Sequence, residues 1–231
     1  MNNAGKSDPF GMSGSDARVL LFDDVVVDGI GLAFEQNARS EGYLTVAGVD
    51  EVGRGCLAGP VVAAACILAP DKPLPAGLDD SKKLTEKKRE AITAELKANC
   101  VAYAIGQIEA DEIDRINILE ATKRAMLAAI AALTPSADYL LIDALHLKQS
   151  PLPQKAIIKG DSISASIAAA SVIAKTYRDD LMRAYHDEFP QYGFAGHKGY
   201  GAATHFAALR QHGPCRLHRL SFRGVVQDSS S

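Results

Sequence analysis

The sequence has no tryptophan, only four cysteines and no long apolar run. The cysteines are scattered and form no CxxC pair, which excludes a disulfide framework and a cysteine-rich zinc site, so we expect reduced, buried thiols. No 18 apolar residues stand together, and the N-terminal residues hold no stretch typical of a signal peptide. We therefore expect a soluble, cytoplasmic protein that does not associate with a membrane.

Positive charge is unevenly distributed in a chain whose formal net charge is -3. That balance argues against a protein that coats nucleic acid through bulk charge alone. Residues 189–227, however, contain no acidic side chain. Basic residues cluster in this segment and in an earlier one: Lys198, Arg210, Arg216, Arg219 and Arg223, and Lys82, Lys83, Lys87, Lys88 and Arg89. Each cluster is either a local surface for a polyanion or an ordinary solvated face.

Apolar runs alternate with amphipathic segments over residues 31–222, which predicts one α/β domain. We expect residues 1–30 to form a disordered extension and residues 223–231 a flexible tail. The expected strands are residues 45–50, 61–68, 139–142 and 156–158, and the expected helices are residues 86–99, 112–133, 167–189 and 202–212. Between the first two strands, GRGCLAGP is too rich in glycine and proline for either structure and predicts a tight loop.

Acidic residues follow the expected strands. Asp50 and Glu51 end the first strand, Asp143 follows YLLI directly, and Asp161 follows AIIKG. Carboxylates at several strand ends can converge on one crevice of an α/β sheet, where a hard cation such as Mg²⁺ or Mn²⁺ would neutralise them. Adjacent strand residues point to opposite faces, so Asp50 and Glu51 can share a site only if Glu51 lies beyond the regular strand or at a bulge. The alternative for each acid is a turn residue or helix cap.

Four carboxylates suit two divalent ions, one activating a water and the other stabilising the leaving oxygen of a phosphoryl displacement. No Walker loop, Ser-His-Asp order or zinc pattern competes with this interpretation, and GRGCLAGP does not match GxxxxGK[ST]. The residues alone therefore predict metal-dependent attack on a phosphodiester.

A set of motifs spread from Gly42 to Phe222 resembles bacterial ribonuclease HII, a type 2 ribonuclease H. The motifs, in chain order, are AGVDEVGRG, LAGPVVAAA, DDSKKLTEKKR, INILEAT, LIDA, KGDS, AAASVIAKTYRD, FPQYGFAGHKGYG and HRLSF. The resemblance implies an RNase H-like fold: a central mixed β-sheet flanked by helices, with a helical C-terminal segment over the substrate groove. The N-terminal extension is too short for the separate N-terminal domain of ribonuclease HIII.

The resemblance also implies an activity and a metal site. The expected enzyme is an endonuclease that hydrolyses the RNA strand of RNA/DNA hybrids and nicks 5' to single ribonucleotides embedded in duplex DNA, leaving 3'-hydroxyl and 5'-phosphate ends. The family's metal-binding Asp-Glu-Asp-Asp quartet matches Asp50, Glu51, Asp143 and Asp161, which would hold two Mg²⁺ or Mn²⁺ ions. We expect it to act as a monomer.

Several residues match positions that contact the substrate in the family. Gly53, Arg54 and Gly55 match the GRG motif that reads the junction between a ribonucleotide and the next deoxyribonucleotide. Tyr200 matches the tyrosine that contacts the 2'-hydroxyl, the group that distinguishes RNA from DNA. Cys56 departs from the pattern, because many relatives have proline there, and we expect a less rigid loop. A plain turn and a core tyrosine are the structural alternatives.

Further candidates would contact phosphates without reading sequence. They are Ser81, Lys82 and Lys83 in the first basic segment, Ser171 and Lys175 on the long helix, and Lys198 beside Tyr200. Asp179 lies on the same helical stripe as Ser171 and Lys175 and is a supporting metal ligand or the ion-pair partner of Lys175. Two other functions stay open: a nuclease that cuts continuous hybrids but ignores isolated ribonucleotides, and a non-catalytic hybrid-binding module.

Overall fold

The computed structural model describes residues 19–21, 25–27 and 29–226. Most of the expected N-terminal extension and the end of the expected tail therefore lie outside the described residues. Two short strands, β1 (Val19–Leu21) and β2 (Val25–Val27), pair antiparallel in a small separate sheet. Among the described helices, none combines the length and the hydrophobicity that a bilayer-spanning segment requires.

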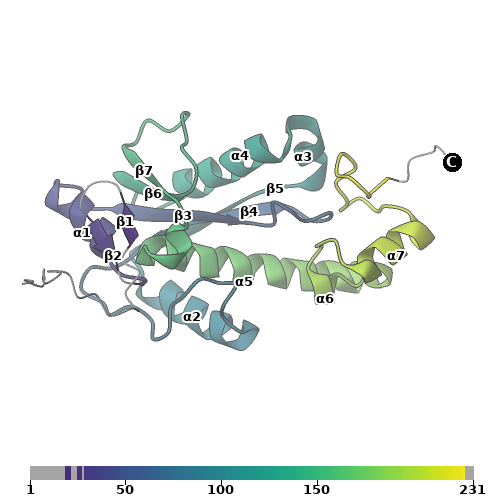
Figure 1. Cartoon of the computed structure of the whole chain (residues 1–231), viewed down its shortest axis with the longest axis horizontal. Helices are drawn as coiled ribbons and strands as arrows, with labels where there is room; N and C mark the ends of the chain where they lie inside the picture. Colours follow the sequence, from purple (N-terminus) through teal and green to yellow (C-terminus); the bar gives the residue numbers. More distant parts are fainter. Residues whose placement is uncertain (1–18, 22–24, 28, 227–231) are drawn as a thin grey trace, which may run out of the picture.

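The centre of the fold is a mixed five-stranded sheet with the strand order β5-β4-β3-β6-β7 (Figure 1). Its strands are β3 (Val46–Val52), β4 (Val61–Ile67), β5 (Ala102–Ile108), β6 (Tyr139–Asp143) and β7 (Gln154–Ile157). β4 is antiparallel to both β3 and β5, whereas β6 is parallel to both β3 and β7. The carboxyl ends of β3, β6 and β7 consequently lie at the same edge of the sheet.

Helices cover both faces of this sheet and give the fold three layers (Figure 1). α4 (Ile118–Ala131) packs on one face, and α5 (Ala165–Glu188) packs on the other, with α2 (Glu86–Asn99) against α5. Every residue of β4 is buried. A strand covered on both faces is apolar throughout rather than alternating, which is why the run VVAAACI identifies it in the sequence.

The expected single helix over residues 112–133 is wrong. The chain instead forms α3 (Ala110–Ile116) and α4, separated by Asn117. Asn117 has a φ of 70°, and its side chain accepts hydrogen bonds from the N–H groups of Leu119 and Glu120. Asparagine is found at positive φ more often than most residues and is a favoured helix cap, so it ends one helix and begins the next. Helix α1 (Ala33–Ser40) and strand β5 were not predicted.

The N-terminal end of α5 lies against the backbone of β3 at Gly48. A Cβ atom at this position would be 2.0 Å from the carbonyl carbon of Ser166 and 2.3 Å from the nitrogen of Ile167. These are backbone atoms of α5, which cannot move without shifting the helix. Only glycine at residue 48 permits this close contact between strand and helix.

We predict that Gly48→Ala lowers the free energy of unfolding by about 3 kcal/mol or more, because the added methyl group forces α5 away from β3. Urea denaturation followed by circular dichroism measures this change. Gly196→Ala is the matched control, since a methyl group added there would meet nothing within 4 Å. The control should stay within about 1 kcal/mol of the parent protein. A Gly48→Ala protein as stable as the control would contradict the packing argument.

The C-terminal part of the chain folds against the end of α5 (Figure 1). It contains the short turn η2 (Pro190–Tyr192), α6 (Phe194–His197) and α7 (Ala203–His212). Their apolar side chains, including Tyr192 and Phe194, form a small core with Met182 of α5. α5 thereby connects the strand-end edge of the sheet with the segment that carries Tyr200.

Candidate active site

The four predicted carboxylates lie at or just beyond the sheet edge where the parallel strands end. Asp50 and Glu51 belong to β3, Asp143 is the last residue of β6, and Asp161 lies after β7 in the turn η1 (Gly160–Ser162). The parallel arrangement of β3, β6 and β7 accounts for this convergence of residues that are far apart in the sequence.

The condition that Glu51 lie beyond the regular strand or at a bulge is not met. Glu51 pairs with Ala63 in an unbroken register with β4, next to the pair of Asp50 with Ala64. On the other side, the pairing of β3 with β6 ends one residue before Asp143. Asp143, the last residue of β6, therefore lies beside this part of β3. Its charge raises the pKa of both Asp50 and Glu51.

Burial and mutual repulsion raise the pKa values of these carboxyls. Asp50 is only 4% exposed, and its desolvation, followed by the charges of Glu51 and Asp143, raises its pKa well above the ordinary value. Burial also raises the pKa of Glu51, against the opposing effect of Arg54, whose Nη1 lies 3.2 Å from Glu51 Oε1. Burial similarly raises the pKa of Asp143. Carboxylates held this way are stabilised by any cation that reaches them.

The turn η1 connects two of the carboxylates directly. The N–H of Gly160 donates to Asp143 Oδ1 at 2.7 Å, so the turn and the end of β6 are joined beside Asp161. Lys82 Nζ donates to Asp161 Oδ2 at 3.1 Å. Asp161 itself is buried, whereas the Lys82 side chain is largely exposed. Lys82 is thus the cation that faces the site from the loop before α2.

Glu35 of α1 is a buried carboxylate that sequence reasoning missed. Its Oε1 accepts hydrogen bonds from the Ser164 hydroxyl at 2.7 Å and from the Ser166 hydroxyl and N–H at 2.6 and 2.8 Å. A negative charge at the N-terminus of α5 is favourable. Because these partners lie 129 and 131 residues away in the chain, no local pattern indicates the contact. Glu35 fixes the chain directly after Asp161.

The carboxylates suit a divalent cation in their chemistry, since Mg²⁺ and Mn²⁺ prefer oxygen ligands of this kind. In the described part of the chain, no group of three Asp, Glu, His or Cys side chains is arranged so that it could hold a metal ion. Two of the carboxylates face protein cations instead: Asp161 pairs with Lys82, and Glu51 pairs with Arg54. Binding a divalent ion would require these two side chains to turn away from their present partners.

Two serines link the first basic segment to Asp50. Ser81 and Ser171 are both buried, and their hydroxyl oxygens lie 3.0 Å apart. Ser171 also hydrogen-bonds Asp50, which lowers the pKa of that carboxyl against the larger effect of burial. Lys83 is not brought to the carboxylates by its contacts, because its Nζ pairs with Asp79 at 3.0 Å on the surface. Lys82 and Lys83 therefore face different partners although they are adjacent.

Asp179 lies two turns beyond Ser171 on α5 and is surrounded by cations. Lys175 Nζ lies 2.5 Å from its Oδ1, and Arg89 Nη2 lies 3.1 Å from its Oδ2. Asp179 is 2% exposed, so both ion pairs are shielded from water. Arg89 also donates to the carbonyl of Leu84 at 2.6 Å, and its ion pair with Asp179 ties the start of α2 to α5. Sequence reasoning counted Arg89 only as part of a basic cluster.

The GRG loop and the Tyr200 segment lie together although they are far apart in the sequence. The N–H of Leu57 donates to the carbonyl of Gly199 at 2.8 Å. Cys56 is fully buried, and its Sγ donates to the carbonyl of Lys198 at 3.7 Å. Burial raises the pKa of Tyr200, and the adjacent Cys56 thiol raises it further. Tyr200 is nevertheless 43% exposed, and Arg54 of the GRG loop is exposed as well.

Two fully buried arginines hold this loop, and sequence reasoning missed both roles. Arg219 donates to the carbonyls of Gly53, Arg54 and Gly59 at 2.7 to 3.1 Å. Arg178 of α5 donates to the carbonyls of Pro60, Ala58 and Lys198 at 2.8 to 3.0 Å. Burial lowers the pKa of Arg219 to about 10. The only sequence signal for Arg178 is an arginine within a largely buried helix.

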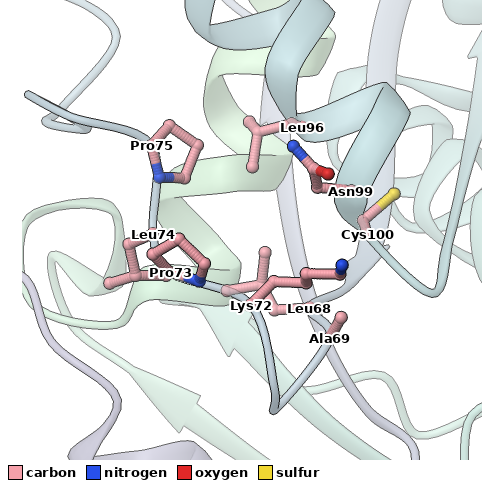
Figure 2. Close-up of a pocket in the computed structure, with 9 residues that line it drawn as sticks. All are labelled: Leu68, Ala69, Lys72, Pro73, Leu74, Pro75, Leu96, Asn99 and Cys100. Carbon is pink, nitrogen blue, oxygen red and sulfur yellow. The ribbon is translucent and has the colours of Figure 1, made fainter.

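A small pocket lies at the opposite edge of the sheet (Figure 2). It is lined by the end of β4, the loop after it and the end of α2: Leu68, Ala69, Lys72, Pro73, Leu74, Pro75, Leu96, Asn99 and Cys100. Because β4 runs antiparallel to β3, its carboxyl end is far from Asp50 and Glu51. This pocket is separate from the carboxylates.

Comparison with known proteins agrees with this geometry. The family model described as Ribonuclease HII matches residues 47–225. A ribonuclease HII from Chlamydia caviae is 59% identical over 195 residues, covering 84% of this chain and 91% of the relative. The crystal structure of ribonuclease H2 from Pyrococcus horikoshii has a TM-score of 0.66 at 24% identity, covering 79% of this chain and 95% of that one. Bst-RNase HIII in complex with Mn²⁺ has a TM-score of 0.61 at 24% identity, covering 81% and 70%.

The mixed sheet, its flanking helices and the structural neighbours define an RNase H-like fold with a helical C-terminal segment. The match over residues 47–225 and the high identity to curated relatives go further. The chain belongs to the ribonuclease HII family. It is therefore a ribonuclease H endonuclease, and its family indicates activity on RNA/DNA hybrids and dependence on a divalent metal.

Proposed function

We propose that this enzyme nicks immediately 5' to a single ribonucleotide in duplex DNA, besides hydrolysing the RNA strand of continuous hybrids. The products carry 3'-hydroxyl and 5'-phosphate ends. The observation that carries the proposal is the junction of the GRG loop with the Tyr200 segment, through Leu57 and Gly199, next to the strand-end carboxylates. A sugar-reading element beside the cleavage site is what recognition of one ribonucleotide requires.

Asp50, Glu51, Asp143 and Asp161 are the residues that would hold two Mg²⁺ or Mn²⁺ ions. When bound, such ions activate a water and stabilise the leaving 3'-oxygen of a phosphodiester. Asp50 is the central ligand in this proposal. It is the least exposed of the four carboxylates, and the charges of Glu51 and Asp143 both act on it. Without bound ions, Lys82 pairs with Asp161 and Arg54 pairs with Glu51. Both basic side chains would be released when the metal ions bind.

Substrate binding is assigned to groups near the carboxylates and, for Lys83, to the neighbouring surface. The Gly53 and Gly55 backbone and the exposed Arg54 and Tyr200 side chains contact the sugar at the junction. Phosphates are held by Lys and hydroxyl groups without reading the base sequence. These groups are Ser81, Lys82, Lys83, Ser171, Lys175 and Lys198. The two cations beside Asp179 favour a role in orienting Lys175 over direct metal binding.

The experiment compares two labelled duplexes, one with a single embedded ribonucleotide and one a continuous RNA/DNA hybrid, with Mg²⁺, Mn²⁺ or chelator. We expect Arg54→Ala and Tyr200→Ala each to lower kcat/KM on the single-ribonucleotide duplex about tenfold or more, and to affect the continuous hybrid less. Both side chains are exposed, so the variants should unfold at nearly the parent temperature.

Arg115→Ala is the control, since its exposed ion pairs on α3 lie outside the proposed site. Equal losses on both duplexes would show that Arg54 and Tyr200 bind the hybrid without reading the junction. Cutting of the continuous hybrid alone by the parent protein would leave a ribonuclease H that ignores isolated ribonucleotides. Tight, salt-sensitive binding without metal-dependent cleavage of any substrate would contradict the catalytic proposal itself.

A further inference from the structure

Three histidines of the C-terminal segment, His197, His205 and His218, form a row behind Tyr200, and two of them are buried. His205 of α7 is fully buried and His218 is 2% exposed. The ring of His205 stacks on that of His197 with centroids 4.3 Å apart, and it lies 5.2 Å from the ring of His218. Phe194 packs its ring edge-on against His205. None of these imidazoles touches the carboxylates, so the proposed chemistry leaves them without a role.

The hydrogen bonds in this row determine where each proton lies. His205 Nδ1 is 2.8 Å from the carbonyl oxygen of Tyr200, and a carbonyl only accepts, so Nδ1 carries the proton. His205 Nε2 is then an acceptor. It lies 3.0 Å from His218 Nε2, which must therefore be the donor.

The hydrogen bonds of His218, at the other end of the row, independently require the same proton positions. With its proton on Nε2, His218 has an acceptor at Nδ1. The backbone N–H of Cys215, which can only donate, lies 2.9 Å from that atom. The Cys215 Sγ lies 3.2 Å from it, and the alternative contact, from Nδ1 to the Cys215 carbonyl, is longer at 3.3 Å. Donors and acceptors therefore match from Cys215 through both rings to Tyr200.

His197 holds the preceding peptide in a similar manner. Its Nε2 lies 2.7 Å from the carbonyl of Tyr192, so this nitrogen donates. Its Nδ1 then accepts from the N–H of Gly199 at 3.2 Å. Gly199 in turn accepts from Leu57 at the end of the GRG loop. The backbone at residues 199 and 200 is thus fixed by two neutral histidines on one side and by the GRG loop on the other.

We propose that His205 and His218 are positioning residues for junction recognition: a one-directional chain of hydrogen bonds from the Cys215 N–H through His218 and His205 to the Tyr200 carbonyl places Tyr200 against the GRG loop. This inference rests on the proposed role of Tyr200 as a reader of the sugar. It concerns the preference between substrates and not the cleavage step, because none of the hydrogen bonds described for the three histidines involves the carboxylates.

The surroundings keep the row neutral. A further proton on His205 would place two N–H groups face to face across the 3.0 Å contact with His218, and a further proton on His218 Nδ1 would face the Cys215 N–H at 2.9 Å. Burial lowers the pKa of His205, and it lowers that of His218 to about 4 with a further contribution from His205. The charged and titratable groups that face the row are Lys198 and His186 beside His197, and the Cys215 thiol beside His218.

Two substitutions of His205 separate the positioning of Tyr200 from a general loss of stability. In His205→Asn the amide nitrogen takes the place of Nδ1 and still donates to the Tyr200 carbonyl, while His218 loses its acceptor. In His205→Gln the amide takes the place of Nε2 and still accepts from His218, while the Tyr200 carbonyl loses its donor. Each variant loses one buried hydrogen bond, so urea denaturation should show similar losses of stability. Thr93→Val, which removes a buried hydrogen bond between α2 and α5, is the control outside the row.

The readout is kcat/KM on the single-ribonucleotide duplex divided by kcat/KM on the continuous hybrid. We expect His205→Gln to lower this ratio about tenfold, and His205→Asn and Thr93→Val to keep it within about twofold of the parent protein. Equal ratios in the Gln and Asn variants, with a parent protein that prefers the junction, would overturn the positioning role. A parent protein without any junction preference would instead overturn the proposed function, and the positioning role with it.

Nitrogen NMR of protein labelled at histidine tests the hydrogen-bond chain separately from activity. At neutral pH we expect the proton on Nδ1 of His205 and on Nε2 of His218 and His197. A charged ring at His205 or His218, or a proton on Nδ1 of His218, would overturn the chain whatever the cleavage assays show.

Discussion

Asp50→Asn is expected to abolish most of the cleavage and at the same time to make the protein more stable. Turnover should fall by about three orders of magnitude, equivalent to roughly 4 kcal/mol of transition-state stabilisation, because the least exposed member of the quartet loses its charge. In chelator, however, the melting temperature should rise by about 2–4 °C. The reason is that Asn removes a desolvated charge that Glu51 and Asp143 repel.

The stability gain depends on pH in a direction that the raised pKa determines. A carboxyl whose pKa is higher in the folded state than in the unfolded state favours folding at low pH and loses this contribution as the pH rises through the folded-state pKa. The parent protein should therefore gain stability relative to Asp50→Asn as the pH is lowered, because Asp50 itself becomes neutral. Calorimetry between mildly acidic and neutral pH measures this convergence.

A second comparison uses the metal. Added Mg²⁺ or Mn²⁺ should raise the melting temperature of the parent protein more than that of Asp50→Asn, since ligand binding to the folded state stabilises it. Thr122→Val on α4 is a control for a buried polar side chain outside the site. A fully active Asp50→Asn protein, or one that melts well below the parent in chelator, would remove Asp50 from the metal site.

Arg219→Ala is expected to cause the largest loss of stability among single substitutions of charged residues near the site. The guanidinium is fully buried and satisfies the carbonyls of Gly53, Arg54 and Gly59. Leaving several buried carbonyls unpaired should lower the free energy of unfolding by about 3–5 kcal/mol. Urea denaturation at neutral pH measures the loss.

Arg219→Lys should give an intermediate loss, because an ammonium can donate to some of these carbonyls but lacks the planar fork of the guanidinium. Arg115→Ala, which removes an exposed arginine with two surface ion pairs, should change stability by no more than about 0.5 kcal/mol. If Arg219→Ala lost less than about 1 kcal/mol, water would have to enter the loop, and the GRG segment would not owe its shape to this side chain.

Elements with strong local signals were predicted well from the sequence. Helix α2 spans residues 86–99, as the sequence predicted, and the Thr85 side chain accepts from the Lys88 N–H as a helix cap does. The run Val61–Ile67 forms β4, and it is buried on both faces as its composition indicated. The carboxylates at strand ends were predictable for the same reason, since each directly follows an apolar run or the short turn after one.

Long-range contacts account for what sequence reasoning missed. Nothing near Glu35 in the sequence indicates a carboxylate that accepts three hydrogen bonds from the start of α5. Arg219 looked like one charge in a basic cluster, yet its partners are about 160 residues away. β5 escaped prediction because its inward positions are small residues such as Ala104 and Gly106, which carry little apolar signal. In each case the partner, rather than the residue, determines the environment.

The length of helix α5 also sets the distance between the carboxylates and the segment that carries Tyr200. It begins just after the turn that carries Asp161, and Arg178, in its second half, binds the carbonyls of both Ala58 and Lys198. Its 24 residues span about 36 Å, and each residue added or removed would shift the far end by about 1.5 Å and turn it by about 100°. A one-residue insertion in α5 before Arg178 would therefore misalign the carboxylates with the GRG loop and Tyr200, while leaving each of these parts locally intact.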